Sequence, residues 1–89
     1  MTWKVELLPQ AERELGNLDP ENARRIFRFL FERVAKLENP RSIGVASHGP
    51  RFGEFWKYRV GDYRLICKIE DDRLLILVLR IGHRKEIYR

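Results

Sequence analysis

Residues 56–68 read Trp-Lys-Tyr-Arg-Val-Gly-Asp-Tyr-Arg-Leu-Ile-Cys-Lys, and this stretch decides the fold. Two runs of alternating side chains flank Gly61-Asp62, a pair typical of a two-residue hairpin turn with glycine first. If Val60 pairs with Tyr63, directly opposed residues share one face of the sheet, because side chains alternate along each strand. That register predicts a core face of aromatic and aliphatic residues, namely Trp56, Tyr58, Val60, Tyr63, Leu65, Cys67 and Ile69.

The opposite face of this hairpin, called the cationic face below, carries Lys57, Arg59, Arg64, Ile66 and Lys68. Arg59 is predicted to lie opposite Arg64, and like charges in that position destabilise a sheet mildly. One interpretation is that long basic side chains simply splay into water. The other is an anion site, since the arginine fork of donors matches a phosphate group. The pattern favours the anion site.

The strand that follows the hairpin is expected over residues 73–81, paired with residues 63–70. Its run from Leu74 to Leu79 is apolar on both faces, which predicts a central strand covered on both sides. Gly82 ends it, and the strand end is expected to bring His83, Arg84 and Tyr88 near the cationic face. A tyrosine there can stack on an unpaired RNA base.

The N-terminal half predicts one strand and two helices. The strand is expected over residues 3–8 and the first helix over residues 10–18. Asp19-Pro20 is a strong helix start, so a second helix is predicted over residues 20–37, followed by a loop over residues 38–53. The order β-α-α-β-β-β predicts an α+β fold in a single domain, 1–89, with both helices packed on one face of a small, mainly antiparallel sheet.

The long helix has an apolar stripe at 3-4 spacing, made of Ala23, Phe27, Leu30, Val34 and Leu37. Phe31 lies at the edge of this stripe, and Phe29 lies about 120° from its centre at 100° per residue. Phe29 is therefore either packed under a neighbouring element or exposed as a contact for a partner protein.

The charge composition indicates which kind of partner the protein binds. The 89 residues include 18 Lys and Arg against 13 Asp and Glu, a net charge of +5. Residues 1–50 carry eight basic and seven acidic residues, and residues 51–89 carry ten and six, so most of the excess lies in the second half. Nucleic acid is the partner that this charge suggests first, with a solvated basic surface as the alternative.

Other chemistries find little support in the sequence. A single cysteine excludes an internal disulfide, and two histidines without a CxxC pair argue against zinc. Cys67 falls on the predicted core face, which argues against a nucleophilic role. There is no phosphate-cradling glycine loop of the P-loop or Rossmann type. Neither a cofactor nor a metal is expected. With no signal peptide and no membrane span, the expected location is the cytoplasm, away from any membrane.

Two motifs resemble the RelE branch of the RelE/ParE toxins. The first is Trp56-Lys-Tyr-Arg-Val-Gly-Asp-Tyr-Arg64, and the second is Arg80-Ile-Gly-His-Arg-Lys-Glu-Ile-Tyr88. Asp19-Pro20, Asn39-Pro40-Arg41 and the final Tyr-Arg fit as well, so the resemblance spans essentially the whole chain. One departure is Ala46-Ser47-His48-Gly49, where the family often has Leu-Lys-Gly; it touches none of the residues to which the resemblance assigns catalysis.

The resemblance implies the toxin of a type II toxin–antitoxin system, a ribosome-dependent endoribonuclease that cuts mRNA in the ribosomal A site without a metal. By position, the family's catalytic residues fall on Lys57, Arg59, Arg64, Arg84 and Tyr88. His83, Lys68 and Lys85 are candidates for RNA binding or for a further part in catalysis. A RelB-like antitoxin is the implied protein partner in a hetero-oligomer, with Phe29 and Phe31 as candidate contacts. Two alternatives stay open: a ParE-type inhibitor of DNA gyrase, and a degenerate toxin that binds RNA without cutting it.

Overall fold

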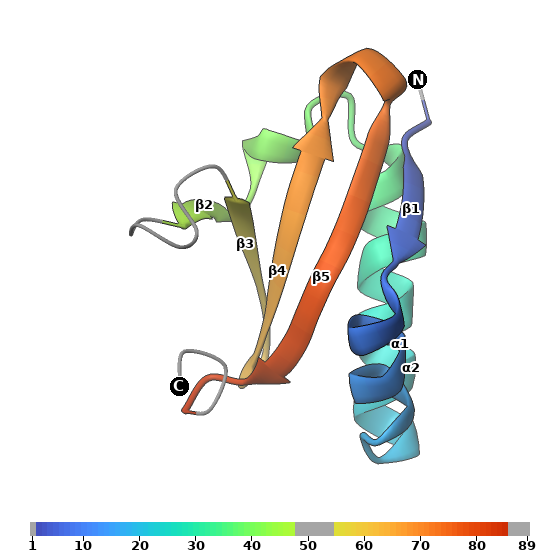
Figure 1. Cartoon of the computed structure of the whole chain (residues 1–89), viewed down its shortest axis with the longest axis vertical. Helices are drawn as coiled ribbons and strands as arrows, with labels where there is room; N and C mark the ends of the chain where they lie inside the picture. The colour runs from blue at the N-terminus through green and yellow to red at the C-terminus, as the bar shows by residue number, and fades with distance from the viewer. Residues whose placement is uncertain (1, 48–54, 86–89) are drawn as a thin grey trace.

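The computed structural model, which describes residues 2–47 and 55–85, is an α+β fold (Figure 1). It contains five strands and two α-helices, and the second helix continues as a π-helical turn, Phe29–Arg33, and a short 3-10 turn, Val34–Lys36. The α-helices and strands are β1 (Lys4–Leu7), α1 (Pro9–Gly16), α2 (Pro20–Arg28), β2 (Val45–Ser47), β3 (Phe55–Val60), β4 (Tyr63–Glu70) and β5 (Leu75–His83). Among the described residues no helix is both long and apolar enough to span a lipid bilayer.

The strands form one mixed sheet in the order β1-β5-β4-β3-β2. β1 runs parallel to β5, whereas β2–β3, β3–β4 and β4–β5 are antiparallel pairs. β5 is therefore an interior strand, between β1 and β4, in agreement with its apolar sequence. Both helices lie on one side of the sheet, as predicted and as Figure 1 shows, so they cover only one face of β5, whereas its apolar run predicts cover on both sides. On the face away from the helices Leu77 is half-buried.

The β3–β4 hairpin has the predicted register. All five pairs agree, from Val60–Tyr63 at the turn to Trp56–Cys67 at the far end. Gly61 takes the first turn position with a φ of +59°, a conformation that glycine adopts without steric cost. The core face is accordingly buried: Tyr58, Leu65 and Cys67 are fully covered.

A β-bulge in β5 changes which side chains face the core. Cys67 pairs with Val78 and Ile66 pairs with Arg80, so Leu79 is the extra residue on β5. A bulge shifts the alternation of side chains by one position. Val78 and Ile81 can both face the core for this reason, and both are buried. The sequence alone gives no sign of this shift.

The second helix buries part of the predicted stripe, but Ile26, at the side of that stripe, takes the buried position expected for Phe27. Ile26, Leu30 and Val34 are fully buried, whereas Phe27 is 51% exposed. A π-helical turn has more residues per turn than an α-helix, so the turn at Phe29–Arg33 keeps Leu30 and Val34 nearly in line. The predicted helix start is confirmed, because the Asp19 carboxylate accepts a hydrogen bond from the Asn22 backbone N–H.

The short strand β2 lies inside the predicted loop 38–53 and extends the sheet beyond β3. Val45 pairs with Lys57 and Ser47 with Phe55. Before it, Gly44 has a φ of +83° and lies against β3. A Cβ added to Gly44 would lie 2.6 Å from both the Lys57 carbonyl oxygen and Trp56 Nε1, so the chain can pass here only with glycine. Trp56 Nε1 in turn donates to the Ile43 carbonyl at 2.8 Å.

Candidate functional site

The cationic face lies on β3 and β4, on the side of the sheet away from the helices. Lys57, Arg59 and Arg64 line a hollow of about 360 Å³, with Gly44 and Val45 as its other lining residues. We call this the site hollow. Arg59 is exposed, while Lys57 and Arg64 are half-buried. Three cations in one open hollow make a surface that attracts anions.

Local sequence explains why these three side chains share the hollow. The register of the hairpin places Arg59 opposite Arg64 and Lys57 opposite Ile66, so all four residues project from the same face. β2 pairs with β3 only as far as Val45 opposite Lys57. Arg59 therefore lies beyond the end of β2, where its side chain remains open to solvent.

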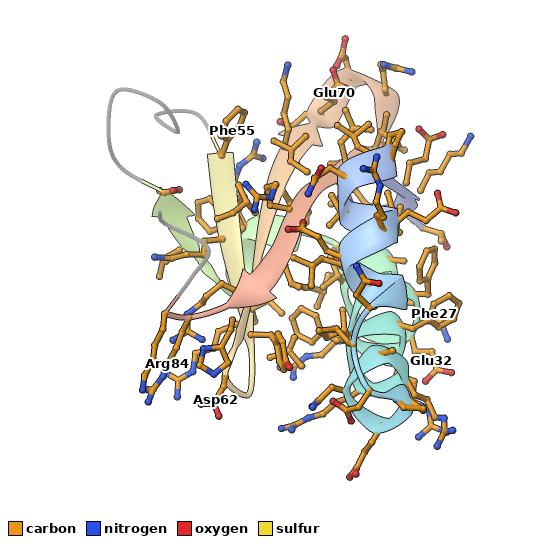
Figure 2. The ribbon with its side chains drawn as sticks, turned by 60° about the horizontal axis from the view of Figure 1, so that its bottom comes forward. Phe27, Glu32, Phe55, Asp62, Glu70 and Arg84 are labelled. Atoms are coloured by element: carbon orange, nitrogen blue, oxygen red, sulfur yellow. The ribbon has the colours of Figure 1, made fainter. Side chains whose placement is uncertain are left out.

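Arg64 and Arg84 are both anchored at the hairpin turn. The Arg64 guanidinium donates to the carbonyls of Gly61, at 3.4 Å, and Tyr63, at 3.2 Å. The Arg84 backbone N–H donates to the Asp62 carbonyl at 2.8 Å, and its Nε lies 3.9 Å from the Asp62 carboxylate. Figure 2 shows Arg84 and Asp62 together at this end of the sheet. The turn thus brings Arg84 to the same end of the sheet as Arg59 and Arg64.

The bulge decides on which side of the sheet the last residues of β5 lie. Gly82 pairs with Arg64 on the cationic side, and His83 pairs with Tyr63 on the core side. The His83 and Tyr63 rings pack edge to face with centroids 5.8 Å apart. His83 therefore does not join the cationic face, contrary to the expectation that it accompanies Arg84 there.

The remaining candidates lie farther from the site hollow. Lys68 is on the cationic face, but four residues along β4 from Arg64, which is about 13 Å at strand spacing. Lys85 is exposed, and its backbone N–H donates to His83 Nδ1. Tyr88, the expected C-terminal catalytic residue, lies outside the described residues, as does His48 in the departure from the family pattern.

The two phenylalanines predicted as partner contacts have different surroundings. Phe29 is half-buried and packs edge to face on Tyr58, with centroids 5.6 Å apart, so the packing interpretation is confirmed for it. Phe31 stacks on Phe27 with centroids 4.5 Å apart. Phe27, which the helical spacing assigned to the core, is the more exposed of this pair. The i, i+4 spacing of two phenylalanines was the available signal for the pair.

Two other ionisable side chains near the site are structural. Burial raises the pKa of the Cys67 thiol, which keeps it protonated and unreactive. Burial also raises the pKa of the Tyr58 hydroxyl, which donates a hydrogen bond to the Pro40 carbonyl. Tyr58 thus ties the segment before β2 to β3, and neither group contributes chemistry to the site hollow.

Comparison with known proteins places this geometry among bacterial and archaeal toxins. A sequence model of the family described as the ParE toxin of the type II toxin–antitoxin system parDE matches residues 5–88. A curated relative, Toxin RelG of Mycobacterium tuberculosis, is 30% identical over 89 residues, which is 100% of this chain and 99% of that protein.

Solved structures show the same fold. In the RelBE2 toxin–antitoxin complex of Mycobacterium tuberculosis, one chain matches with a TM-score of 0.85 and 25% identity, covering 94% of this chain and 100% of that one. In the archaeal RelE–RelB complex of Pyrococcus horikoshii, the TM-score is 0.73 at 24% identity, over 97% and 99% of the two chains. The isolated E. coli RelE toxin matches with a TM-score of 0.70 at 18% identity, over 97% and 90%.

Proposed function

The chain belongs to the RelE/ParE superfamily of toxins from type II toxin–antitoxin systems, and from that premise we propose that it is a ribosome-dependent mRNA endoribonuclease. The observation that supports this most is the site hollow, in which Lys57, Arg59 and Arg64 converge. Its cations suit the phosphodiester of an RNA strand, and RNA supplies its own nucleophile in the 2′-OH.

The proposed reaction is an attack of the 2′-oxygen on the neighbouring phosphorus. A bond forms between the 2′-oxygen and phosphorus while the bond from phosphorus to the 5′-oxygen breaks, leaving a cyclic phosphate and a 5′-hydroxyl. The 2′-OH must lose a proton to a base. Lys57 is the proposed base, because a neutral lysine amine can accept a proton whereas an arginine stays protonated.

Arg59 and Arg64 are proposed to stabilise the negative charge that develops on the phosphorane, since they stay protonated throughout. Arg84 is proposed to stabilise the leaving 5′-oxygen, which takes its proton from water. Tyr88 is proposed to stack on and orient a base. Lys68, Lys85 and His83 are proposed RNA contacts outside the reacting centre, with His83 approaching from the opposite side of β5.

A RelB-like antitoxin is the proposed protein partner, in a hetero-oligomer. Several of the matching solved structures are toxin–antitoxin complexes, among them RelBE2 of Mycobacterium tuberculosis and the RelE–RelB complex of Pyrococcus horikoshii. Acidic residues of such a partner would meet the cationic face, and its apolar residues would cover Phe31 together with Phe27. Because the proposed substrate is mRNA on the ribosome, the proposed place of action is the cytoplasm.

Inhibition of DNA gyrase is the second candidate function, because the matching family model is described by its ParE members. A gyrase inhibitor has no need of a lysine beside two arginines in one hollow, so the site hollow argues against this candidate. The third candidate is a degenerate toxin that binds RNA without cutting it. Its affinity for RNA would still fall strongly as the salt concentration rises.

The test is to induce the protein in a bacterial host and map mRNA 5′ ends, beside Arg84→Ala and the control Arg73→Ala. Arg73 is exposed at the far end of the sheet and pairs with Glu70 at 3.1 Å. We expect in-frame cuts in translated messages for wild type and the control, and none for Arg84→Ala. Growth arrest without such cuts would support gyrase inhibition, and neither arrest nor cuts would support the degenerate toxin.

A further inference from the structure

A second arginine-lined hollow lies where the end of the β3–β4 hairpin meets the second helix. Its volume is about 400 Å³, and its charged lining residues are Arg25, Arg28, Glu32, Arg33 and Arg59. We call it the helix hollow. Four cations against one carboxylate leave it with a net charge of +3 by this lining, which is the electrostatic footprint of a polyanion site.

The helix hollow and the site hollow share one side chain. Arg59 lines both of them. Arg25 completes the connection at the turn, because its Nη1 lies 3.1 Å from the position of a Cβ added to Gly61. Cations thus continue without a break from the cationic face, past the turn at Gly61, to the outer surface of α2.

These arginines contribute little to the fold. Arg25 and Arg28 are exposed, and in the described ranges, 2–47 and 55–85, neither takes part in an ion pair. Arg24 and Arg28 are four residues apart on the helix, and Arg25 and Arg28 three apart, so their like charges destabilise it. Only Arg33 has a packing role, with its guanidinium 5.9 Å from the centre of the Phe29 ring.

We propose that the helix hollow binds RNA phosphates outside the cleaved step, so that the bound RNA extends from the site hollow over Arg59 to Arg25 and Arg28. The inference rests on the proposed function for the identity of the polyanion. Phosphate suits the hollow because several guanidinium groups can surround one phosphate group and donate to its oxygens together. The RNA is either the flanking part of the cleaved strand or a structured RNA of the ribosome.

The test measures binding rather than cleavage, so its outcome is separate from that of the nuclease assay. The probes are 2′-O-methyl oligoribonucleotides, which keep every phosphate but cannot be cut by attack of a 2′-OH. A dinucleotide fills only the site hollow, whereas a strand of about 12 nucleotides can also reach the helix hollow. An RNA hairpin of the same phosphate number represents the structured source.

The variant is Arg25→Gln/Arg28→Gln, and its control is Arg13→Gln/Arg73→Gln, which removes the same charge from exposed positions elsewhere. For the variant we expect about tenfold weaker binding of the long strand or of the hairpin at low salt, with dinucleotide binding unchanged. The slope of the logarithm of the binding constant against the logarithm of the salt concentration, measured with the long probe, should fall in magnitude by about 0.7 for each phosphate that the variant can no longer neutralise. The long probe that loses affinity for the variant, whether the single strand or the hairpin, identifies the source of the phosphates.

Three results would overturn the proposal. They are equal losses in the variant and the control, equal losses for the dinucleotide and the long probes, and no loss for either long probe. Weaker binding of poly-glutamate by the variant, with RNA binding unchanged, would also overturn it and assign the hollow to an acidic polypeptide. If length-dependent RNA binding is lost as expected while induced cells show no mRNA cuts, the proposed nuclease fails and the helix hollow stands as an RNA site.

Discussion

Arg59 lies directly opposite Arg64 across the β3–β4 ladder, with Lys57 two residues away on the same face. Opposed like charges on a sheet oppose folding, by some tenths of a kcal/mol per pair. Within the described part of the chain, neither arginine has a carboxylate partner. An anion in the site hollow would explain the arrangement, because a phosphate attracts both guanidinium groups and offsets the repulsion between them.

The variant Arg64→Gln separates the contribution of this arginine to RNA cleavage from its effect on the stability of the fold. Loss of a cation that stabilises the transition state should lower mRNA cleavage about 10²- to 10³-fold. The free energy of unfolding should stay within about 0.5 kcal/mol of wild type, because relief of the repulsion offsets the loss of an exposed hydrogen bond to the Gly61 carbonyl and a partly buried one to the Tyr63 carbonyl. Cleavage mapped in induced cells and urea denaturation measure the two quantities, with Arg73→Gln as control. Wild-type cleavage, or a stability loss above about 2 kcal/mol, would contradict the assigned role.

Among Gly16, Gly44 and Gly61, Gly44 is expected to tolerate a side chain least. In Gly44→Ala the new Cβ would meet the Lys57 carbonyl oxygen and the Trp56 ring at 2.6 Å, at a φ of +83°. We expect a stability loss of about 1–3 kcal/mol and a displaced Lys57. Gly16→Ala is the matched control, since a Cβ added there has no neighbour within 4 Å. Thermal unfolding of both variants tests this, and equal melting temperatures would contradict it.

The hairpin was predictable because two local signals agree: a period of two in the side chains, and a glycine at the first turn position. The cationic face followed from that register with no information from the rest of the chain. His83 was not predictable in this way. Its side of the sheet depends on the bulge at Leu79, which arises where β5 must keep both Val78 and Ile81 in the core.

Tertiary structure also overrides the helix pattern and the loop. The predicted stripe correctly includes Leu30 and Val34, but it places Phe27 rather than Ile26 on the buried face, and the π-helical turn at Phe29–Arg33 interrupts the α-helical spacing on which it was based. β2 has three residues, too few for a periodic pattern. It forms because β3 offers an edge and Gly44 permits a close approach. Neither condition can be read from residues 38–53 alone.

Glu14 is expected to position Arg84 from a distance. Its carboxylate accepts hydrogen bonds from Arg80 Nε and Nη2 and from the Ile81 backbone N–H, at 2.9–3.2 Å. β1 pairs with β5 only up to Val78, so Glu14 satisfies an edge amide that no strand reaches. Glu14→Ala should cost about 1–3 kcal/mol of stability, because it leaves this buried N–H without an acceptor.

The control for Glu14 is Glu12→Ala, an exposed position on the same helix. It should change stability by less than about 0.5 kcal/mol. Hydrogen exchange of the Ile81 amide should accelerate in Glu14→Ala alone, and mRNA cleavage should fall with it although no charge in the site hollow has changed. Unchanged exchange at Ile81 would show that Glu14 does not hold β5.

The cap of α2 gives a pH dependence with a definite sign. Hydrogen bonds from the Asn22 side chain and backbone lower the pKa of Asp19 below its ordinary value of 3.8. A group with a lowered folded-state pKa stabilises the protein above its unfolded-state pKa, and this contribution is lost as the pH falls through the folded-state value. The stability difference between wild type and Asp19→Ala should therefore be full at pH 6 and shrink below about pH 3.8. A constant difference across this range, measured by urea denaturation, would be inconsistent with the ionised cap.

The Phe27–Phe31 stack and the half-buried Phe29 should respond oppositely to substitution. Phe27 is 51% exposed, so Phe27→Ser should leave the free energy of unfolding of the free toxin within about 0.5 kcal/mol. Phe29→Leu removes an edge-to-face contact with Tyr58, 5.6 Å between centroids, and should cost about 1–2 kcal/mol.

If an antitoxin covers the stack, Phe27→Ser should weaken the toxin–antitoxin complex about tenfold, whereas Phe29→Leu, once folded, should bind as wild type does. Calorimetric titration of each purified variant with the cognate antitoxin measures this. An unchanged affinity for Phe27→Ser would place the antitoxin on another surface, because a stack at the centre of an interface could not lose one of its rings without a cost in binding.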